Sequence, residues 1–478
     1  MMAERLAAVA LLDLRVAFPR HRLERTTIAE AWGRRCTPGS LPLAGFDEDS
    51  LTLAGDALRG ILNRGQAGAL VMASTSHPHG ERSTVAVLAE AFGLAPDSTV
   101  IDAGASLAAS TSIVALLADR VRARGQMVIG LAADCRRARP GTDLETRLGD
   151  AGAAFSLGPV AEAGIIATLI GEAAIASDVP ETWRGALAPE LTVADPSFAP
   201  QQTLVPLIER IVRAACADAG VAPDDVTAVA AGAPDTKFVV AALSAAGCSA
   251  GAGAPVTESA DLAGFSGSAT PWLALACALR RAAPGSIVVQ FSAGGGCATA
   301  AVWRVEAGNA AWTAAGAGGL DSPIADAIPT YARALRLRGL IGNETVEPYA
   351  SMPLLAREAD QDIRLLASRC EHCGRLDFPQ RRVCVGCGST RFDTTPLSQR
   401  GRLVTFTEDY VYPAPEPPTV MAVADMDGGG RFFGQLTGAG AGVARTGLRV
   451  ELVLRKLHTG GDWTHYFWKL RPVEEPVR

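Results

Sequence analysis

Residues 98–134, STVIDAGASLAASTSIVALLADRVRARGQMVIGLAAD, decide the fold class of this chain. An apolar run ending at Asp102 is followed by a turn of small residues, an Ala-rich helical stretch over 107–125 and a second apolar run over 126–134. Apolar strands that alternate with helices predict a layered α/β fold. Aromatic residues are only 5% of the chain, so Ala, Val and Leu must build most of the core.

The same order of elements recurs further along the chain. The first copy begins with GALVMAST at 68–75 and closes with GDAGAAFSLG at 149–158. The second copy has VTAVAAGAPD at 226–235, DLAGFSGSAT at 261–270, a helix over 270–285 and two strands over 286–305. We therefore expect a duplicated fold with a pseudo-two-fold axis.

Four cysteines form two C-x2-C pairs, Cys370 with Cys373 and Cys384 with Cys387. Such pairs place four thiolates around one tetrahedral ion, for which Zn²⁺ is favoured. Four protein ligands leave no open position, so we expect a structural zinc. Redox cysteines or iron binding are the alternatives. The six other cysteines stand singly in Ala-rich surroundings, which is typical of small buried side chains.

The C-terminal part has its own core, because residues 370–478 hold 11 of the 26 aromatic residues. Five runs there alternate apolar with polar residues between Gly and Pro turns, which predicts a small closed β-barrel. The predicted domains are two α/β halves over 1–170 and 171–327, a helical linker over 328–369, a zinc ribbon over 370–395 and an OB-fold barrel over 396–478.

Charge and hydropathy exclude several classes of protein. With 44 Lys+Arg against 50 Asp+Glu, the net charge of −6 argues against nucleic acid as the main partner. The start of the chain lacks the order of a signal peptide, and no uncharged apolar run reaches the length of a membrane span. We expect a cytoplasmic protein without a membrane partner.

The stretches SRCEHCGRLDFPQRRVCVGCG at 368–388, GRLVTFT at 401–407, GLRVEL at 447–452 and FWKLRPV at 467–473 resemble a known family. They are similar to the rubredoxin-like zinc ribbon plus OB-fold proteins that accompany thiolases and hydroxymethylglutaryl-CoA (HMG-CoA) synthases. The resemblance implies acyl-CoA binding and the bridging of partner enzymes. An OB barrel can instead bind single-stranded nucleic acid, but 14 Lys+Arg against 12 Asp+Glu over 370–478 give no strongly basic groove.

The first 305 residues resemble the thiolase superfamily, and within it HMG-CoA synthase and ketoacyl-acyl-carrier-protein synthase III. The matching stretches are LLDLRVAFPRHRLERTTIAEAWG at 11–33, FDEDSLTLAGDAL at 46–58, VIDAGASLAAST at 100–111, LAADCR at 131–136, GDAGAAFSLG and the run over 267–296. The chemistry of that family needs a Cys nucleophile at a helix N-terminus, a His in the second half and, in these two branches, an Asn beside it.

At the positions that match the family's motifs, this sequence lacks the Cys, His and Asn. The nucleophile position falls at Leu107, beside Ser106, and Gly232 stands where the His is expected. Pro234 and Asp235 are kept, whereas Gly264-Phe265 replaces the Gly-Asn turn and the acid of the HMG-CoA synthase branch maps near Thr75. No histidine lies between His79 and His372, so a second-half His is missing whatever the alignment.

Other residues offer only weak substitutes, and we predict no catalytic residue of the family type. Ser106 precedes a helix without an evident base, which favours a capping role, and Cys297 lies in the Gly-rich stretch SAGGGCATA. His77 and His79 are expected to order a loop. Three arginines, Arg136, Arg137 and Arg139, either meet coenzyme A phosphates or form a solvated basic loop.

The main hypothesis is a non-catalytic, degenerate thiolase-fold subunit that binds acyl-CoA and scaffolds a thiolase or acyltransferase complex. Its expected partner is an active thiolase-fold subunit in a hetero-oligomer, or a second copy in a homodimer. The alternative is an active acyl-CoA synthase or acyltransferase that makes or cleaves C–C bonds with non-standard residues.

Overall fold

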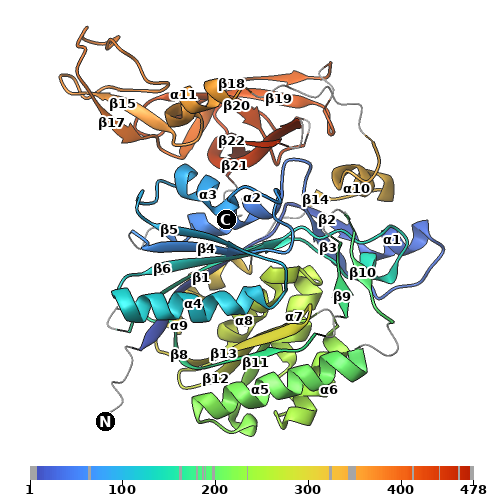
Figure 1. The fold of residues 1–478 in the computed structure, drawn as a ribbon. Coiled ribbons are helices and arrows are strands. Elements are labelled where there is room, and N and C mark those ends of the chain that lie inside the picture. Colours follow the sequence, from blue (N-terminus) through green and yellow to red (C-terminus); the bar gives the residue numbers. More distant parts are fainter. Residues whose placement is uncertain are drawn as a thin grey trace. The chain divides into compact units, whose positions relative to one another are not determined.

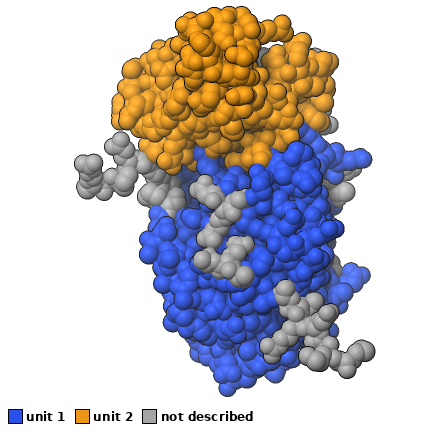
Figure 2. Space-filling model, turned by 90° about the vertical axis from the view of Figure 1, so that its left-hand side faces the viewer, with its two compact units in different colours: residues 1–45, 49–89, 94–334 blue, residues 46–48, 90–93, 335–478 orange. Residues whose placement is uncertain are grey.

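The computed structural model describes residues 8–62, 66–160, 164–178, 181–185, 188, 190–195, 200–233, 235–321, 326–342, 351–411, 414–440, 442–460 and 463–473. The chain divides into two compact units, which Figure 2 shows in blue and orange. The first unit holds residues 1–45, 49–89 and 94–334, and the second unit holds 46–48, 90–93 and 335–478. Among the described residues, no helix has the length and apolar character needed to cross a membrane.

A nine-stranded mixed sheet forms the first unit, in the order β11-β12-β13-β8-β1-β7-β6-β4-β5. Its strands are β1 (Val9–Ala17), β4 (Ala69–Ala73), β5 (Thr99–Ala103), β6 (Val128–Asp134), β7 (Ala151–Pro159), β8 (Ala167–Ala176), β11 (Ala228–Gly232), β12 (Ile287–Gly294) and β13 (Cys297–Val305). In each half, parallel strands are followed by antiparallel ones: β4 pairs in parallel with β5 and β6, and β11 with β12. An antiparallel contact between β1 and β8 joins the halves.

Helices and the two halves of this sheet form successive layers, as Figure 1 shows. Helices α4 (Ala109–Arg124) and α8 (Thr270–Arg281) lie between the halves, since α4 packs on β6 and β13 and α8 packs on β1 and β11. Helix α2 (Ser50–Arg59) covers the first half, and α5 (Val205–Ala219) covers the second. In the core between them, the rings of Phe155 and Trp272 stack with centroids 3.6 Å apart. The predicted duplicated, layered α/β fold is confirmed.

The two halves differ at one position of the repeat. Strand β5 stands at the edge of the first half, whereas the described residues 247–253 of the second half contain no strand. This stretch, GCSAGAG, lacks the β-branched residues that favour a strand.

Shorter elements complete the first unit. They are β2 (His21–Glu24), α1 (Arg25–Ala31), β3 (Ser40–Leu43), α3 (Thr84–Ala91), β9 (Thr182–Trp183), β10 (Thr192–Val193), α6 (Thr236–Ala246), α7 (Ala254–Ala263), α9 (Asn309–Ala314) and β14 (Asp326–Ala327). The chain continues through α10 (Tyr331–Leu337) and α11 (Met352–Asp362), while residues 343–350 between them lie outside the described residues. The residue boundaries predicted for the domains stay predictions.

The second unit contains a zinc-ribbon-like sheet and a closed barrel. The small sheet has the order β16-β15-β17, from β15 (Leu366–Cys370), β16 (Leu376–Asp377) and β17 (Phe392–Pro396). The barrel closes in the order β18-β19-β20-β22-β21. Its strands are β18 (Arg400–Asp409), β19 (Thr419–Met426), β20 (Arg431–Leu436), β21 (Arg449–Gly460) and β22 (Trp463–Pro472). Inward-facing residues alternate with outward-facing ones, which confirms the predicted five-stranded barrel.

Buried charges are part of the second unit. The Lys469 ammonium lies 2.9 Å from an Asp47 carboxylate oxygen, which also accepts the Thr437 hydroxyl at 2.7 Å. Beside this pair, Arg455 forms an ion pair with Glu48 at 3.3 Å. Burial alone raises the pKa of Asp47, but the neighbouring cations Lys469 and Arg455 outweigh it and hold that pKa below its usual value. Residues 46–48 therefore complete the barrel's packing by neutralising two cations.

Candidate functional site

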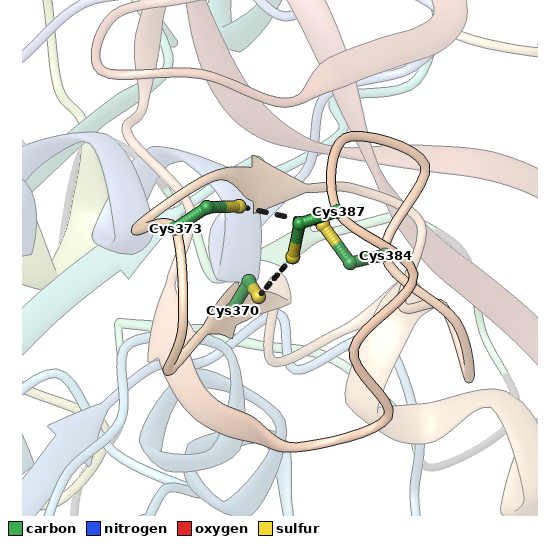
Figure 3. Close-up of side chains that lie close together, drawn as sticks. All are labelled: Cys370, Cys373, Cys384 and Cys387. Carbon is green, nitrogen blue, oxygen red and sulfur yellow. Dashed lines mark hydrogen bonds between the residues drawn. The ribbon is translucent and has the colours of Figure 1, made fainter.

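The zinc-ribbon loops bring all four predicted ligands together, as Figure 3 shows. Each C-x2-C pair closes in the same way: the Gly374 N–H donates to the Cys370 carbonyl and the Gly388 N–H to the Cys384 carbonyl, both at 2.9 Å. Both glycines adopt positive φ, 72° and 74°, a conformation that a residue with a Cβ adopts only with strain. The spacing seen in the sequence thus folds into two equivalent turns that face each other.

The geometry of the four thiol sulfurs fits a tetrahedral metal site. The Sγ atoms lie within 4.8 Å of one another, with Cys370 and Cys387 at 3.6 Å and Cys373 and Cys384 at 3.5 Å. A tetrahedral ion with Zn–S bonds of about 2.3 Å holds its sulfurs about 3.8 Å apart. His372 is exposed on the first turn and does not belong to this group of ligand atoms among the described residues.

In the first unit, apolar packing occupies two of the positions that the resemblance assigns to chemistry. Leu107 and Phe265 are only 5% and 6% exposed and belong to one small cluster with Ala138 and Leu148. The Arg136 guanidinium lies 5.0 Å from the centre of the Phe265 ring, a cation–π distance. The positions of the expected nucleophile and the expected Asn thus contact a common apolar core.

Gly232 and Thr75, at the positions of the expected His and the expected acid, also have structural roles: Gly232 is tightly packed and Thr75 is hydrogen-bonded. A Cβ added to Gly232 would lie 2.8 Å from the Pro271 side chain, so a larger residue there must displace its neighbour. The hydroxyl and the N–H of Thr75 both donate to Asp134, at 3.0 and 2.7 Å. Asp134 is fully buried and also accepts from Ser74, Ser76 and the N–H of Ser268. Its carboxylate therefore organises this loop junction.

The two weak candidates for a nucleophile lie side by side. Ser106 Oγ and Cys297 Sγ are 3.0 Å apart. The Ser106 hydroxyl also donates to the Gly294 carbonyl at 2.9 Å and accepts the Ala108 N–H at 3.2 Å, one residue before α4. These bonds make Ser106 a clamp between the turn before α4 and the Gly-rich turn, but not the N-cap that was expected, because the N-cap residue of α4 is Ala108 and this helix has no side-chain cap.

Sequence reasoning missed Glu181, which lies at the same turn. Glu181 is 5% exposed, and one of its oxygens lies 2.6 Å from where a Cβ of Gly294 would be. The pKa of Glu181 is raised by burial, although hydrogen bonds from its own N–H and from the Gly295 N–H, and the charge of Arg136, act in the opposite direction. No local signal marks this residue, because the glycines beside its carboxylate lie more than 100 positions further along the chain.

The remaining predicted residues have structural partners. His77 Nε2 lies 3.1 Å from the Ala103 carbonyl, so this histidine orders its loop as expected. Burial lowers the pKa of His79 on the same loop. Asp235 caps α6 through the Lys237 N–H and pairs with Arg147 at 2.9 Å, while Pro234 lies outside the described residues.

Only two of the three predicted arginines are exposed. Arg137 and Arg139 face solvent, but Arg136 is 7% exposed under Phe265. Neither alternative given for Arg136, a contact for coenzyme A phosphates or part of a solvated basic loop, fits a side chain that is buried under Phe265. Arg136 lies two residues after the end of the completely buried strand β6, and its guanidinium packs against the aromatic ring.

Comparisons with known proteins match both parts of the chain. Two family models match the second unit: the "ChsH2, rubredoxin-like zinc ribbon domain" over residues 357–393 and the "ChsH2, C-terminal OB-fold domain" over 394–455. A DUF35 domain-containing scaffold protein of Methanocaldococcus jannaschii is 31% identical over 116 residues, covering 23% of this chain and 82% of that protein.

Relatives of the thiolase fold are matched as well. The HMG-CoA synthase of Archaeoglobus fulgidus is 33% identical over 189 residues, which cover 36% of this chain and 52% of that enzyme. The chain thus spans about half the length of this synthase.

Solved structures extend the similarity of fold. An HMG-CoA synthase complexed with CoA superimposes with a TM-score of 0.61 at 16% identity, over 72% of this chain and 96% of that one. The HMG synthase of the curacin pathway, in complex with a holo donor-ACP, superimposes with a TM-score of 0.60 at 16% identity, over 73% and 94%. The chain therefore belongs to the DUF35 domain family and combines a zinc ribbon and an OB fold that match the ChsH2 models with a thiolase fold of the HMG-CoA synthase type.

Proposed function

We propose that this chain is a non-catalytic thiolase-fold subunit that binds acyl-CoA and scaffolds an acyl-CoA-processing complex. The observation that carries the proposal is the apolar cluster of Leu107 and Phe265, at the positions where the resemblance expects a nucleophile and an Asn. Neither side chain can form a thioester or polarise a carbonyl. Gly232 stands where the resemblance expects the His, so the Cys, the Asn and the His of one catalytic set are all replaced by residues without a reactive side chain.

The proposed partner is a second thiolase-fold chain that carries the catalytic residues. Support comes from β5, which forms an edge of the sheet and therefore presents unpaired backbone groups. Val100 and Ile101 on this strand are 36% and 44% exposed, and Leu116 of α4 is 60% exposed. Exposed apolar side chains on a free strand edge favour pairing with another chain. The matched DUF35 protein is itself described as a scaffold protein.

Acyl-CoA as the ligand is supported by the relatives and by charge. HMG-CoA synthases share the fold, and one of the similar structures is a complex with CoA. Arg137 and Arg139 are exposed on the loop after β6 and offer guanidinium groups for phosphates. In the second unit, we propose that Cys370, Cys373, Cys384 and Cys387 hold one structural zinc, which supplies folding energy.

The test separates a scaffold from an enzyme. The purified chain is incubated with acetyl-CoA and acetoacetyl-CoA, and intact-protein mass spectrometry then detects any acyl adduct. We expect binding without an adduct and without turnover. An adduct on Ser106 or Cys297, abolished by Ser106→Ala or Cys297→Ala, would establish the alternative of an active acyltransferase, because these two side chains already lie 3.0 Å apart.

The partner is tested by co-expression with candidate thiolase-fold chains that retain Cys and His. Light scattering should show a hetero-oligomer, and its activity should be absent from either chain alone. Ile101→Asp should dissociate it, since this change places a charge on the free strand edge. Thr227→Asp, on a residue next to the opposite edge strand β11, is the matched control and should leave assembly unchanged. A homodimer that turns over acyl-CoA unaided would contradict the scaffold proposal.

A further inference from the structure

The second unit is built from three separate stretches of the chain, residues 46–48, 90–93 and 335–478. The shortest stretch is Phe46-Asp47-Glu48, and it lies against the barrel strands β21 and β22. Its three residues belong to no helix or strand, so regular structure does not fix their place. The contacts that hold them therefore define what this face of the barrel binds.

Charges of opposite sign meet at this face. Lys469 of β22 lies 2.9 Å from the Asp47 carboxylate, and Arg455 of β21 lies 3.3 Å from the Glu48 carboxylate. The Thr437 hydroxyl donates to the Asp47 oxygen that faces Lys469. Lys469 and Arg455 are only 1% and 2% exposed, and removing one partner of such a buried pair leaves an uncompensated charge. The two buried cations of the barrel thus obtain their carboxylates from residues 46–48.

Backbone groups and a ring add specificity to these charges. The Lys456 N–H donates to the Asp47 carbonyl at 2.9 Å, and the Lys456 ammonium lies 3.5 Å from the Glu48 carbonyl. The Lys469 ammonium also lies 5.3 Å from the centre of the Phe46 ring, within cation–π range. Each of the three residues therefore has its own partner on the barrel. We name these partners the cationic face, which consists of Thr437, Arg455, Lys456 and Lys469.

We propose that the cationic face is a receptor for an acidic protein segment, an aromatic residue followed by two carboxylates, and that residues 46–48 fill it in cis. The inference goes beyond the proposed function and does not rest on the binding of acyl-CoA. A segment on the same chain has a high effective concentration, so it excludes the same chemistry offered in trans. A separate protein chain with such a segment binds this face only when residues 46–48 do not fill it.

A variant that empties the face tests the receptor. Phe46→Gly, Asp47→Gly and Glu48→Gly are combined in the full chain, and the probe is the peptide LAGFDEDSL, which copies residues 43–51. We expect the triple variant to bind this peptide in titration calorimetry. At a peptide concentration ten times the Kd, hydrogen exchange of the β21 and β22 amides should slow about tenfold, because the peptide binds only the folded barrel.

The controls show whether the cationic face itself binds the peptide. The wild-type chain should not respond, because residues 46–48 already fill the face. The peptide LAGFNQDSL, with amides in place of the two carboxylates, should bind the triple variant about tenfold more weakly. Lys469→Met, added to the triple variant, should weaken binding of LAGFDEDSL by a similar factor. The receptor is overturned if the folded triple variant binds no peptide, binds both peptides equally, or binds LAGFDEDSL no better than the wild-type chain.

A double-mutant cycle covers the case in which the triple variant does not fold. Asp47→Leu and Lys469→Met each leave one buried charge without its partner, whereas the combined variant replaces the pair by apolar groups. We expect each single variant to lower the thermal midpoint of the second unit, and the combined variant to regain about half of the summed loss. Strictly additive losses would mean that the barrel cation does not recognise the carboxylate, and would overturn the receptor.

Discussion

The zinc ribbon and the thiolase-like site belong to one chain but compare differently with the families that they resemble. The ribbon keeps all four thiols that its site needs, with their sulfurs within 4.8 Å. The thiolase-like unit keeps its sheet and helices but holds Leu107, Gly232 and Phe265 where the resemblance expects reactive groups. Metal ligands stabilise the fold they belong to, whereas a catalytic Cys or His contributes little to folding and is replaceable once its chemistry is no longer used.

The largest expected effect follows removal of a metal ligand. Cys373→Ala should abolish zinc binding and unfold the ribbon, since structural zinc sites contribute about 10–16 kcal/mol in small zinc-finger peptides. Metal analysis should find about one zinc per wild-type chain and none in the variant. Hydrogen exchange should show the ribbon unprotected and the sheet of the first unit intact.

His372→Ala is the matched control for the metal ligand. This residue lies on the same turn but is exposed and outside the ligand group. The variant should retain zinc and stability. Loss of zinc in His372→Ala, or a folded ribbon in Cys373→Ala, would contradict the four-cysteine site.

The next largest expected effect is a loss of unfolding free energy when the buried ion pair of the second unit is broken. Asp47→Asn leaves Lys469, which is 1% exposed, without its counter-charge, and breaking such a pair costs about 3–5 kcal/mol. Chemical denaturation followed by fluorescence of the buried Trp468 measures the loss. Asp427→Asn, which breaks an exposed pair with Arg449, is the control and should cost at most about 1 kcal/mol.

The same residue predicts a pH dependence. The pKa of Asp47 is lower in the folded chain than the unfolded value of about 3.9. Its contribution to stability is therefore complete above that unfolded pKa and is lost as the pH falls through the folded pKa. Asp47→Asn should remove this part of the acid sensitivity, and an unchanged acid profile would show that the carboxylate has no such role.

The sequence predicted those features that depend on residues close together along the chain, and missed those that depend on contacts between distant residues. The cysteine pairs at fixed spacing and the alternation in the barrel strands lie within short stretches, so both were read correctly. Asp47 meets Lys469 422 residues further on, and nothing near Asp47 marks it as buried. Residues 46–48 were read as part of the α/β unit for the same reason, although they pack with the barrel.

Within the thiolase-like site, sequence reasoning predicted which residues stand at the positions of the family's reactive groups, but not how those residues pack. Leu107 and Phe265 stood out because the resemblance assigns roles to their positions. Their contact in one cluster required the fold, since they lie on different halves of the repeat. Arg136 was read as either a contact for coenzyme A phosphates or part of a solvated basic loop, because charge predicts exposure unless the fold supplies a partner such as the Phe265 ring.

A moderate loss of stability is expected at Gly232, the position where the resemblance expects a His, if the packing around it leaves no room for a side chain. Gly232→Ala places a Cβ 2.8 Å from Pro271 and should destabilise the first unit by about 1–3 kcal/mol through overpacking. Gly251→Ala, where no atom lies within 4 Å of the added Cβ, should be neutral or slightly stabilising. Equal thermal midpoints for the two variants would mean that a side chain still fits at Gly232.

The smallest effect distinguishes a clamp from a nucleophile. Ser106→Ala removes the bond to the Gly294 carbonyl and the acceptor of the Ala108 N–H, which should cost about 1 kcal/mol of unfolding free energy. Cys297→Ala, which removes only the thiol next to it, should cost less. If the hydroxyl only clamps the turn, Ser106→Ala lowers the midpoint of the first unit, and a complex with an active partner keeps its turnover rate. A complex that loses activity while the midpoint stays constant would place Ser106 in the chemistry, and the contrast between a retained ribbon and an emptied thiolase site would no longer hold.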